Sequence, residues 1–239
     1  MTGDGVNDIL ALKEADCSIA IAEGSDAAKQ ISQVVLLNSE FSSLPDVLLE
    51  GRRVVNNVTR VASVFFIKTI YSIFISLYCV ILNRSFPFIP IQITLIDAVV
   101  EAFPAFLTIM ESNTKPIKDK FLPVVFRKAS SSAVAVIFSI ITIMIIGDIF
   151  VLPATQTTTM MYFALAVISM EAVIRSCLPM NTLRFIVCSG MILGFKFAIT
   201  IFNNLLHITM LSYDLALVTV IVILVGIGIR YIINQINSR

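Results

Sequence analysis

Six apolar segments, each about as long as a lipid bilayer is thick, constrain this chain more than any other feature of its sequence. They cover residues 61–82, 88–110, 131–152, 159–178, 185–206 and 214–234. A helix needs roughly 20 apolar residues to cross a hydrocarbon core of about 30 Å. Hydrophobic residues make up 57% of the chain and charged residues 14%, whereas soluble domains have about 45–50% and about 25%. We therefore predict a mainly α-helical membrane protein with six transmembrane helices, surrounded by lipid and without a nucleic-acid partner.

The charges between these segments predict how the helices are oriented. Basic residues gather before the first segment, in the second and fourth connections and at the end of the chain, while the other connections offer only Arg84 and His207. By the positive-inside rule, both termini are then cytoplasmic. We expect a multi-pass protein of the plasma membrane with a cytoplasmic tail at 235–239. The basic residues are Arg52, Arg53, Arg60, Lys115, Lys118, Lys120, Arg127, Lys128, Arg184, Arg230 and Arg239.

The first 40 residues differ from the rest, because they alternate like an α/β unit. The stretch "MTGDGVND" is typical of a strand end and loop, "SIAIA" and "QVVLL" are typical of buried strands, and short helices are predicted between them. Two or three strands do not make a stable sheet with covered faces. Residues 1–40 are therefore interpreted as part of a domain, residues 41–60 as a stalk helix, and residues 61–234 as the transmembrane domain.

The second apolar segment carries two acids at membrane depth, where an ionisable group costs at least about 2.5–3.5 kcal/mol on insertion scales. Asp97 and Glu101 are four residues apart, so both carboxylates are predicted on one helical face. Pro104 has no N–H, so the carbonyl of Val100 is predicted to lack its helical partner. Several hard oxygens at one point suit Ca²⁺ or another hard cation. The alternative is a kinked helix whose acids pair with a neighbouring helix.

Further charges lie within the apolar segments, among them Lys68, Glu171 and Lys196. Lys68 is expected near Asp97 and Glu101 as a counter-charge, although its long stem also allows it to reach the cytoplasmic surface. Glu171 is a third candidate ligand, but Arg175 follows it at i+4, so a local ion pair is the alternative. The sequence offers no account of Lys196.

The opening block "TGDGVNDILALKEADCSIAIAEGSDAAKQISQVVLL" closely resembles the last motif block of the phosphorylation domain of P-type (E1–E2) ATPases, with Ser18 where that family usually has glycine. The resemblance implies a haloacid-dehalogenase-like fold in which Asp4 helps to bind Mg²⁺, Asn7 contacts the phosphoryl group and Asp8 supports the same site. Gly3 and Gly5 would let the backbone approach the phosphate closely.

The resemblance continues into the membrane segments. "EGRRVVNN" looks like the family's stalk, and "PIQITLIDAVVEAFPA" looks like its sixth membrane helix. Asp97 and Glu101 then match ion-binding positions of the calcium-pump-like branch, and Glu171 lies near another. Lys68 is unusual for a calcium pump. The family's phosphorylated aspartate, in its DKTGT motif, does not occur in this sequence, nor does a nucleotide-binding domain.

These observations lead to one leading hypothesis and two alternatives. The chain is expected to be the C-terminal piece of an ATP-driven cation transporter that exports Ca²⁺ or a similar divalent ion, inactive alone and completed by an N-terminal half that binds most of the ATP. A lipid or polyamine translocase of the same family is the first alternative, motivated by Lys68. A non-catalytic membrane fragment or remnant is the second.

Overall fold

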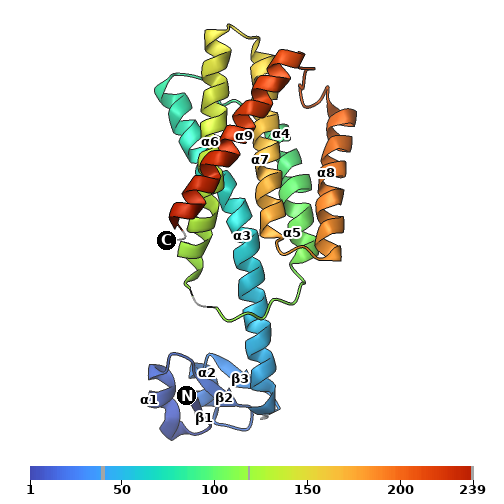
Figure 1. The fold of residues 1–239 in the computed structure, drawn as a ribbon. Helices are drawn as coiled ribbons and strands as arrows, with labels where there is room; N and C mark the ends of the chain where they lie inside the picture. The colour runs from blue at the N-terminus through green and yellow to red at the C-terminus, as the bar shows by residue number, and fades with distance from the viewer. Residues whose placement is uncertain (39–40, 118, 238–239) are drawn as a thin grey trace. The chain divides into compact units, whose positions relative to one another are not determined.

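The computed structural model describes residues 1–38, 41–117 and 119–237. The chain divides into two compact units, Met1–Arg52 and Arg53–Arg239, which are drawn in Figure 1. Each unit has its own packed core, and each is described here by itself.

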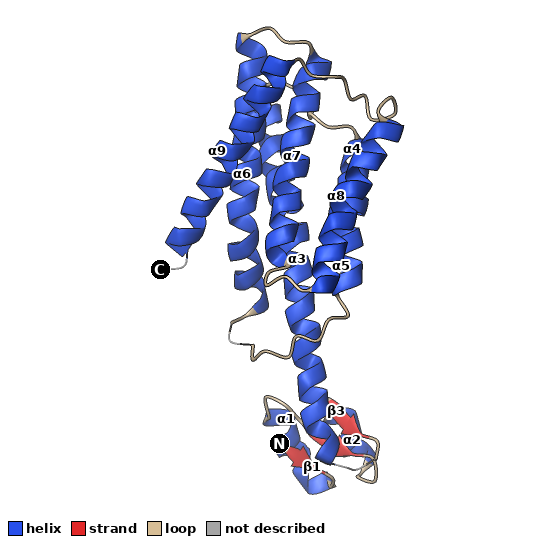
Figure 2. Cartoon of the chain, turned by 45° about the vertical axis from the view of Figure 1, so that its right-hand side comes forward, coloured by secondary structure: helices blue, strands red, loops and turns tan. Residues whose placement is uncertain are grey.

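The first unit is a small parallel sheet with short helices. Strands β1 (Thr2–Gly3), β2 (Ile19–Ile21) and β3 (Val34–Leu36) are ordered β1-β2-β3, and Figure 2 shows them in red. Gly3 pairs with Ala20, and Ile21 pairs with Leu36. The 3₁₀ turn η1 (Val6–Asp8) and helices α1 (Ile9–Glu14) and α2 (Asp26–Ile31) connect the strands. This segment is the α/β unit that the sequence predicted.

The second unit is helical, and six helices of the described chain are long and apolar enough to cross a membrane. The first is α3 (Leu44–Ile81), which follows the turn η2 (Phe41–Ser43). The second is formed by α4 (Pro90–Leu95), η3 (Ile96–Ala102) and α5 (Phe103–Thr108). The others are α6 (Phe121–Ile149), α7 (Ala154–Ser176), α8 (Thr182–Phe202) and α9 (Tyr213–Asn237). The predicted fold class is therefore confirmed.

Two helices extend well beyond the predicted apolar segments. The helix α3 contains most of the expected stalk and nearly all of the first apolar segment without a break, and α6 begins ten residues before its apolar segment. Hydropathy marks only the part of a helix that lipid can surround, whereas a helix continues wherever its backbone hydrogen bonds continue. Arg127 and Lys128 thus lie within α6 although they are charged.

The helices α6, α7 and α9 lie side by side and pack against one another (Figure 1). Small residues allow this approach, since Ala133, Ala135 and Ser139 of α6 are completely or almost completely buried. A Cβ at Gly226 of α9 would lie only 2.6 Å from the Ser139 Oγ. Small residues at such contacts let helix backbones approach closely, which is the usual way for helices to pack in lipid.

Candidate functional site

The GDGVND loop directly follows strand β1, and Asp8 organises it. One carboxylate oxygen of Asp8, Oδ2, accepts the backbone N–H groups of Asp4 at 3.1 Å and of Gly5 at 3.2 Å. A Cβ at Gly3 would lie 2.6 Å from the Cβ of Asp8. Glycine at position 3 is therefore needed for Asp8 to fold back over the strand end, which explains the spacing of the motif.

The same loop presents its remaining polar groups to the surface. Asp4 and Asn7 are exposed, and Asp8 is half-buried. Asp4 stands at the carboxyl end of a parallel strand, where its carboxylate offers the hard oxygen that Mg²⁺ prefers. The donor set therefore fits Mg²⁺, and the structure brings the three predicted residues into one loop.

The second membrane helix is interrupted by a π-helical segment, η3, which contains Asp97 and Glu101. The N–H of Phe103 bonds to the carbonyl of Ala98, five residues earlier. With the same spacing of five residues, an N–H at position 104 would bond to the carbonyl of Val99. This is one residue before the Val100 carbonyl that the sequence predicted to lack its partner. π-Helical turns occur frequently at functional sites. The free carbonyl thus lies in the same segment as the two acids.

Asp97 forms an ion pair with Lys68 of α3, through Oδ2 and Nζ. The Lys68 side chain is 37% exposed and the Asp97 side chain 29% exposed within this chain. Of the two carboxylates considered for Lys68, the structure selects Asp97. Lys68 therefore reaches across to the neighbouring helix and does not extend towards a membrane surface.

Glu101 is in a different environment, because it is only 3% exposed and its Oε2 has no hydrogen-bond partner in the described part of the chain. It lines a cavity of about 10 Å³ between α3, α5 and α7, which is close to the ~10–15 Å³ that one water molecule needs. The side chains of Asp97 and Lys68 lie close enough to the Glu101 carboxyl group to interact with it electrostatically. Glu101 is therefore directed into the bundle and keeps a free oxygen there.

Glu171 of α7 is paired with two arginines. Arg175, on the next turn, and Arg230 of α9 each contact one of its carboxylate oxygens. The local ion pair considered for Arg175 is present, and Arg230, expected among the cytoplasmic charges at the chain end, is only 5% exposed. No group of three or more His, Cys, Asp or Glu residues that could hold a metal occurs in the described ranges. Glu171 is therefore not gathered with Asp97 and Glu101, and its role as a ligand stays a prediction.

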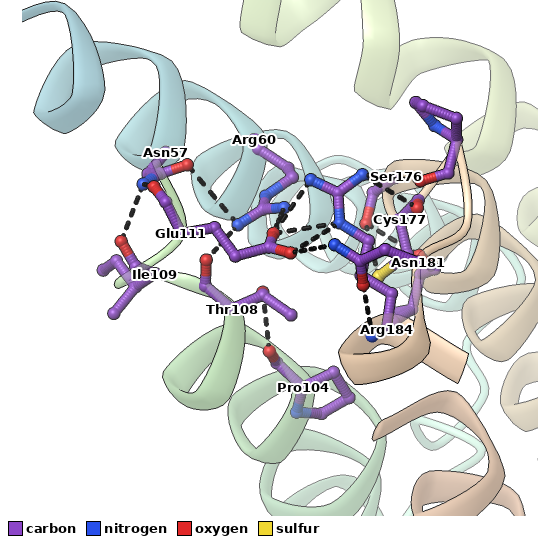
Figure 3. A network of polar contacts seen from close by, with 12 residues as sticks. Asn57, Arg60, Pro104, Thr108, Ile109, Glu111, Ser176, Cys177, Asn181 and Arg184 are labelled. Atoms are coloured by element: carbon purple, nitrogen blue, oxygen red, sulfur yellow. Dashed lines mark hydrogen bonds and ion pairs between the residues drawn. The ribbon is translucent and has the colours of Figure 1, made fainter. Parts of the chain in front are cut away.

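A second carboxylate cluster, which the sequence did not suggest, surrounds Glu111 just beyond α5 (Figure 3). Arg60 of α3 donates to Oε2 at 2.8 Å, and Arg184 of α8 donates from Nε to both oxygens at 2.9 Å. Asn181 donates to Oε1 at 3.0 Å. Burial alone would raise the pKa of Glu111, but the hydrogen bonds from Arg184, Arg60 and Asn181 lower this pKa to about 2. Glu111 thus joins three helices as a fixed anion.

The surrounding backbone is held by the same residues. Arg184 also donates to the carbonyls of Cys177 at 3.0 Å and Pro179 at 2.9 Å. These hydrogen bonds hold the loop between α7 and α8 against the start of α8. Asn57 of α3 donates to the carbonyls of Ile109 and Glu111, both at 2.7 Å. We call the side chains of Asn57, Arg60, Glu111, Asn181 and Arg184 the Glu111 cluster.

The sequence contained a weak signal for the Glu111 cluster. Arg60, Glu111 and Arg184 each stand at the end of an apolar segment, on the side where basic residues gather. A charge at such a position is usually solvated, so no local pattern indicates that these three residues are partners. Lys196 is exposed on α8, and its ammonium group has no partner among the residues described.

Comparisons with known proteins agree with this architecture. No protein-family model matches the chain. A probable cation-transporting ATPase, exp7, of Streptococcus pneumoniae is 45% identical over 203 residues, which are 82% of this chain and 26% of that protein. The calcium-transporting ATPase CtpE of Mycobacterium bovis is 42% identical over 144 residues, 56% of this chain and 18% of that protein. A calcium-transporting ATPase of Bacillus subtilis is 33% identical over 106 residues, 44% of this chain and 12% of that protein.

The chain spans about a quarter of the length of the first of these relatives and less of the others. These sequence matches agree with the architecture, in which a small parallel α/β segment comes before six candidate membrane helices in the chain. The resemblance that the GDGVND block indicated is thus confirmed, and this chain is a partial match to bacterial cation- and calcium-transporting ATPases of the P-type family, over 203 residues of the first relative and 144 of the second.

Proposed function

We propose that this chain supplies the membrane cation site of an ATP-driven P-type transporter that moves Ca²⁺ or a similar divalent cation. The names of the matched relatives support this proposal, since they are called cation- or calcium-transporting ATPases. The observation that carries it is the free carboxylate oxygen of Glu101, buried inside a helix bundle of membrane-spanning length. A buried, unpaired carboxylate is costly unless it binds something.

The surrounding residues suit a hard cation. Glu101 offers its free oxygen, and the carbonyl of Val99 lacks a donor from Pro104 on the same segment. Asp97 is the second carboxylate, but Lys68 occupies it. A divalent cation that binds both acids must therefore displace the Lys68 ammonium group, and Lys68 returns to Asp97 when the cation leaves. Glu171 is a further ligand only if it releases its arginines.

The loop of the first unit suits the ATP-dependent part of such a cycle. Asp4 would bind Mg²⁺, which supplies charge neutralisation for a phosphoryl group when it is bound. Asp8 positions the loop through its two backbone contacts, and Asn7 is free to contact phosphate. We further propose that ATP binds mainly to a partner N-terminal half of the pump, and that both termini face the cytoplasm at the plasma membrane.

Cation-stimulated phosphorylation from ATP tests this function. It is measured in membranes that express the complete reading frame encoding this chain, with Asp97→Asn and Glu101→Gln together. Stimulation by Ca²⁺ should be lost, because the two carboxylates are gone while the helix keeps its shape. Asp148→Asn is the matched control, since Asp148 pairs with Arg84 at 2.7 Å elsewhere in the bundle. Unchanged stimulation in the double variant would refute the assignment.

A lipid or polyamine translocase is the alternative that the Lys68–Asp97 ion pair favours, because this pair halves the negative charge available to a metal. Polyamine or lipid should then accelerate dephosphorylation of the complete pump, and Ca²⁺ should not. The remaining alternative, a non-catalytic membrane protein, predicts no phosphorylated intermediate with either substrate.

A further inference from the structure

A cavity of about 630 Å³ opens at the basic end of the helical unit, between α3, α6, α7 and α9. This volume is in the range of about 300–1,000 Å³ that is typical of ligand sites. The cavity lies next to the Glu111 cluster, because Arg60 and Arg184 line it as well. It does not include Asp97 or Glu101, although Arg60, Val64 and Ser176 line both this cavity and the small one beside Glu101.

The charge around this cavity is predominantly positive. Five cationic side chains line it, and Asp119 is the only acid among the described lining residues. Glu111 and Glu171 lie behind the lining and neutralise part of this charge. The cationic residues are Arg60, Lys128, Arg175, Arg184 and Arg230.

Three of these cations have donors without a partner in the described chain, namely Arg60 through its Nε, Arg230 and Lys128. The Arg230 side chain is 6% exposed, and its Nε has no hydrogen-bond partner in the described chain, so it is a buried donor at the cavity wall. Lys128 is exposed at the rim, and no described residue pairs with its ammonium group. The ammonium group of Lys128 is therefore available to an anion that binds in the cavity.

Part of the remaining wall is apolar, and the rest carries polar side chains such as Thr59, Ser63 and Asn234. Val64 and Ile67 of α3 and Ala172 of α7 are buried in the apolar part, while Phe121 and Leu178 at the rim are 38% and 58% exposed. A free phosphate ion has no use for an apolar wall. A phospholipid does, because its phosphate is followed by a glycerol backbone and acyl chains. Basic pockets between transmembrane helices on the cytoplasmic side are known to bind acidic lipid headgroups.

We propose that this cavity binds the phosphate headgroup of an anionic phospholipid. Arg230 and Lys128 bind the phosphate from two sides, and Phe121 and Leu178 contact the first carbons of the acyl chains. The lipid thereby fills the space between α3, α6, α7 and α9. Neither Asp97 nor Glu101 lines this site, so lipid binding here does not depend on whether this chain transports Ca²⁺.

Native mass spectrometry of the purified chain in detergent tests this proposal. The chain is titrated with phosphatidylglycerol, with phosphatidylcholine and with inorganic phosphate. We expect one phosphatidylglycerol molecule to bind selectively, and Lys128→Glu to weaken its binding by about 10- to 30-fold, as expected for reversing one charge beside an acidic headgroup. Lys120→Glu is the matched control, since Lys120 precedes α6 at the same end and does not line the cavity.

The outcomes separate the possible sources of the phosphate group. Selective lipid binding that is lost in Lys128→Glu and retained within about threefold in Lys120→Glu would support the proposal. Equal loss in both variants would show a diffuse surface attraction and overturn it. Displacement of the lipid by millimolar inorganic phosphate would instead assign the cavity to a free anion. Equal binding of phosphatidylcholine would show that the charge of the headgroup does not determine binding, and would also overturn the proposal.

Discussion

Glu101 lies within the second membrane helix and Glu111 ten residues later, just beyond its end, yet their surroundings are opposite. The carboxylate of Glu111 accepts hydrogen bonds from Arg60, Asn181 and Arg184. Glu101 is more deeply buried, and one of its oxygens has no partner among the described residues. One acid is fully compensated and the other is left partly uncompensated.

This difference separates a structural carboxylate from one that is available for a ligand. The pairing of Glu111 joins α3 and α8 to the end of α5, so its negative charge contributes to the stability of the fold. Glu101 brings no comparable contact, so burying its carboxyl group costs stability in the absence of a cation. A cation bound at Glu101 would recover this cost, and this is how a buried acid can serve transport.

The largest expected effect is that of Glu111→Gln. The change should lower the free energy of unfolding by about 3–5 kcal/mol, because it leaves two largely buried arginines without their anion. The measurement is an SDS titration of the purified chain in detergent, followed by circular dichroism. Asp119→Asn is the control, since Asp119 forms only an exposed pair with Arg127. A loss below about 1 kcal/mol would mean that the Glu111 cluster adds little to the fold.

A smaller effect is expected when the wild-type chain is acidified. The pKa of Glu111 is about 2 in the folded chain, against an ordinary value of 4.5. The unfolded chain therefore binds more protons between these values, and the stability present at neutral pH is lost as the pH falls from about 5 towards 2. The loss of stability at pH 3 should be smaller than the loss caused by Glu111→Gln, because the Glu111 carboxylate of the folded chain is still mostly ionised at pH 3. In the Glu111→Gln variant, this part of the pH dependence should disappear.

Glu101→Gln should act in the opposite direction. Replacing this buried carboxyl group by a neutral amide removes the cost of ionising it and should raise the free energy of unfolding by about 1–2 kcal/mol when no cation is present. The same SDS titration in a chelating buffer measures it, with Glu111→Gln as the matched substitution. If both variants are destabilised equally, the two carboxylates have the same structural role and the comparison fails.

The sequence was sufficient for the features that depend on local pattern. Each apolar segment is visible within about 20 residues, and so is the spacing of Asp97, Glu101 and Pro104. The GDGVND block could be recognised because its spacing follows from short-range geometry, such as the contact of Gly3 with Asp8. These features need no knowledge of which helices become neighbours.

The remaining features depend on long-range packing and could not be predicted. Glu111 meets Arg60 across 51 residues and Arg184 across 73 residues of sequence. Arg230 looked like one more cytoplasmic charge, because nothing near it in sequence indicates that it is buried against Glu171. The π-helical register of Ile96–Ala102 was also missed, since one proline indicates a break in the α-helix but not the way in which the backbone absorbs it.

The smallest effect concerns Asn181, which sharpens the comparison because it is the uncharged residue that donates to the Glu111 carboxylate. Its Oδ1 accepts the N–H of Arg184 at 2.8 Å and caps α8, while its Nδ2 donates to Glu111. Asn181→Ala should lower the free energy of unfolding by about 1 kcal/mol, as is usual for the loss of an N-terminal cap. Asn181→Asp separates the two contacts, because it keeps the cap but places a second anion beside Glu111. If Asn181→Asp is as stable as the wild type, the cap on α8 is the contact that contributes to stability. If Asn181→Asp is less stable than Asn181→Ala, the new carboxylate is repelled by Glu111, which already neutralises the two arginines.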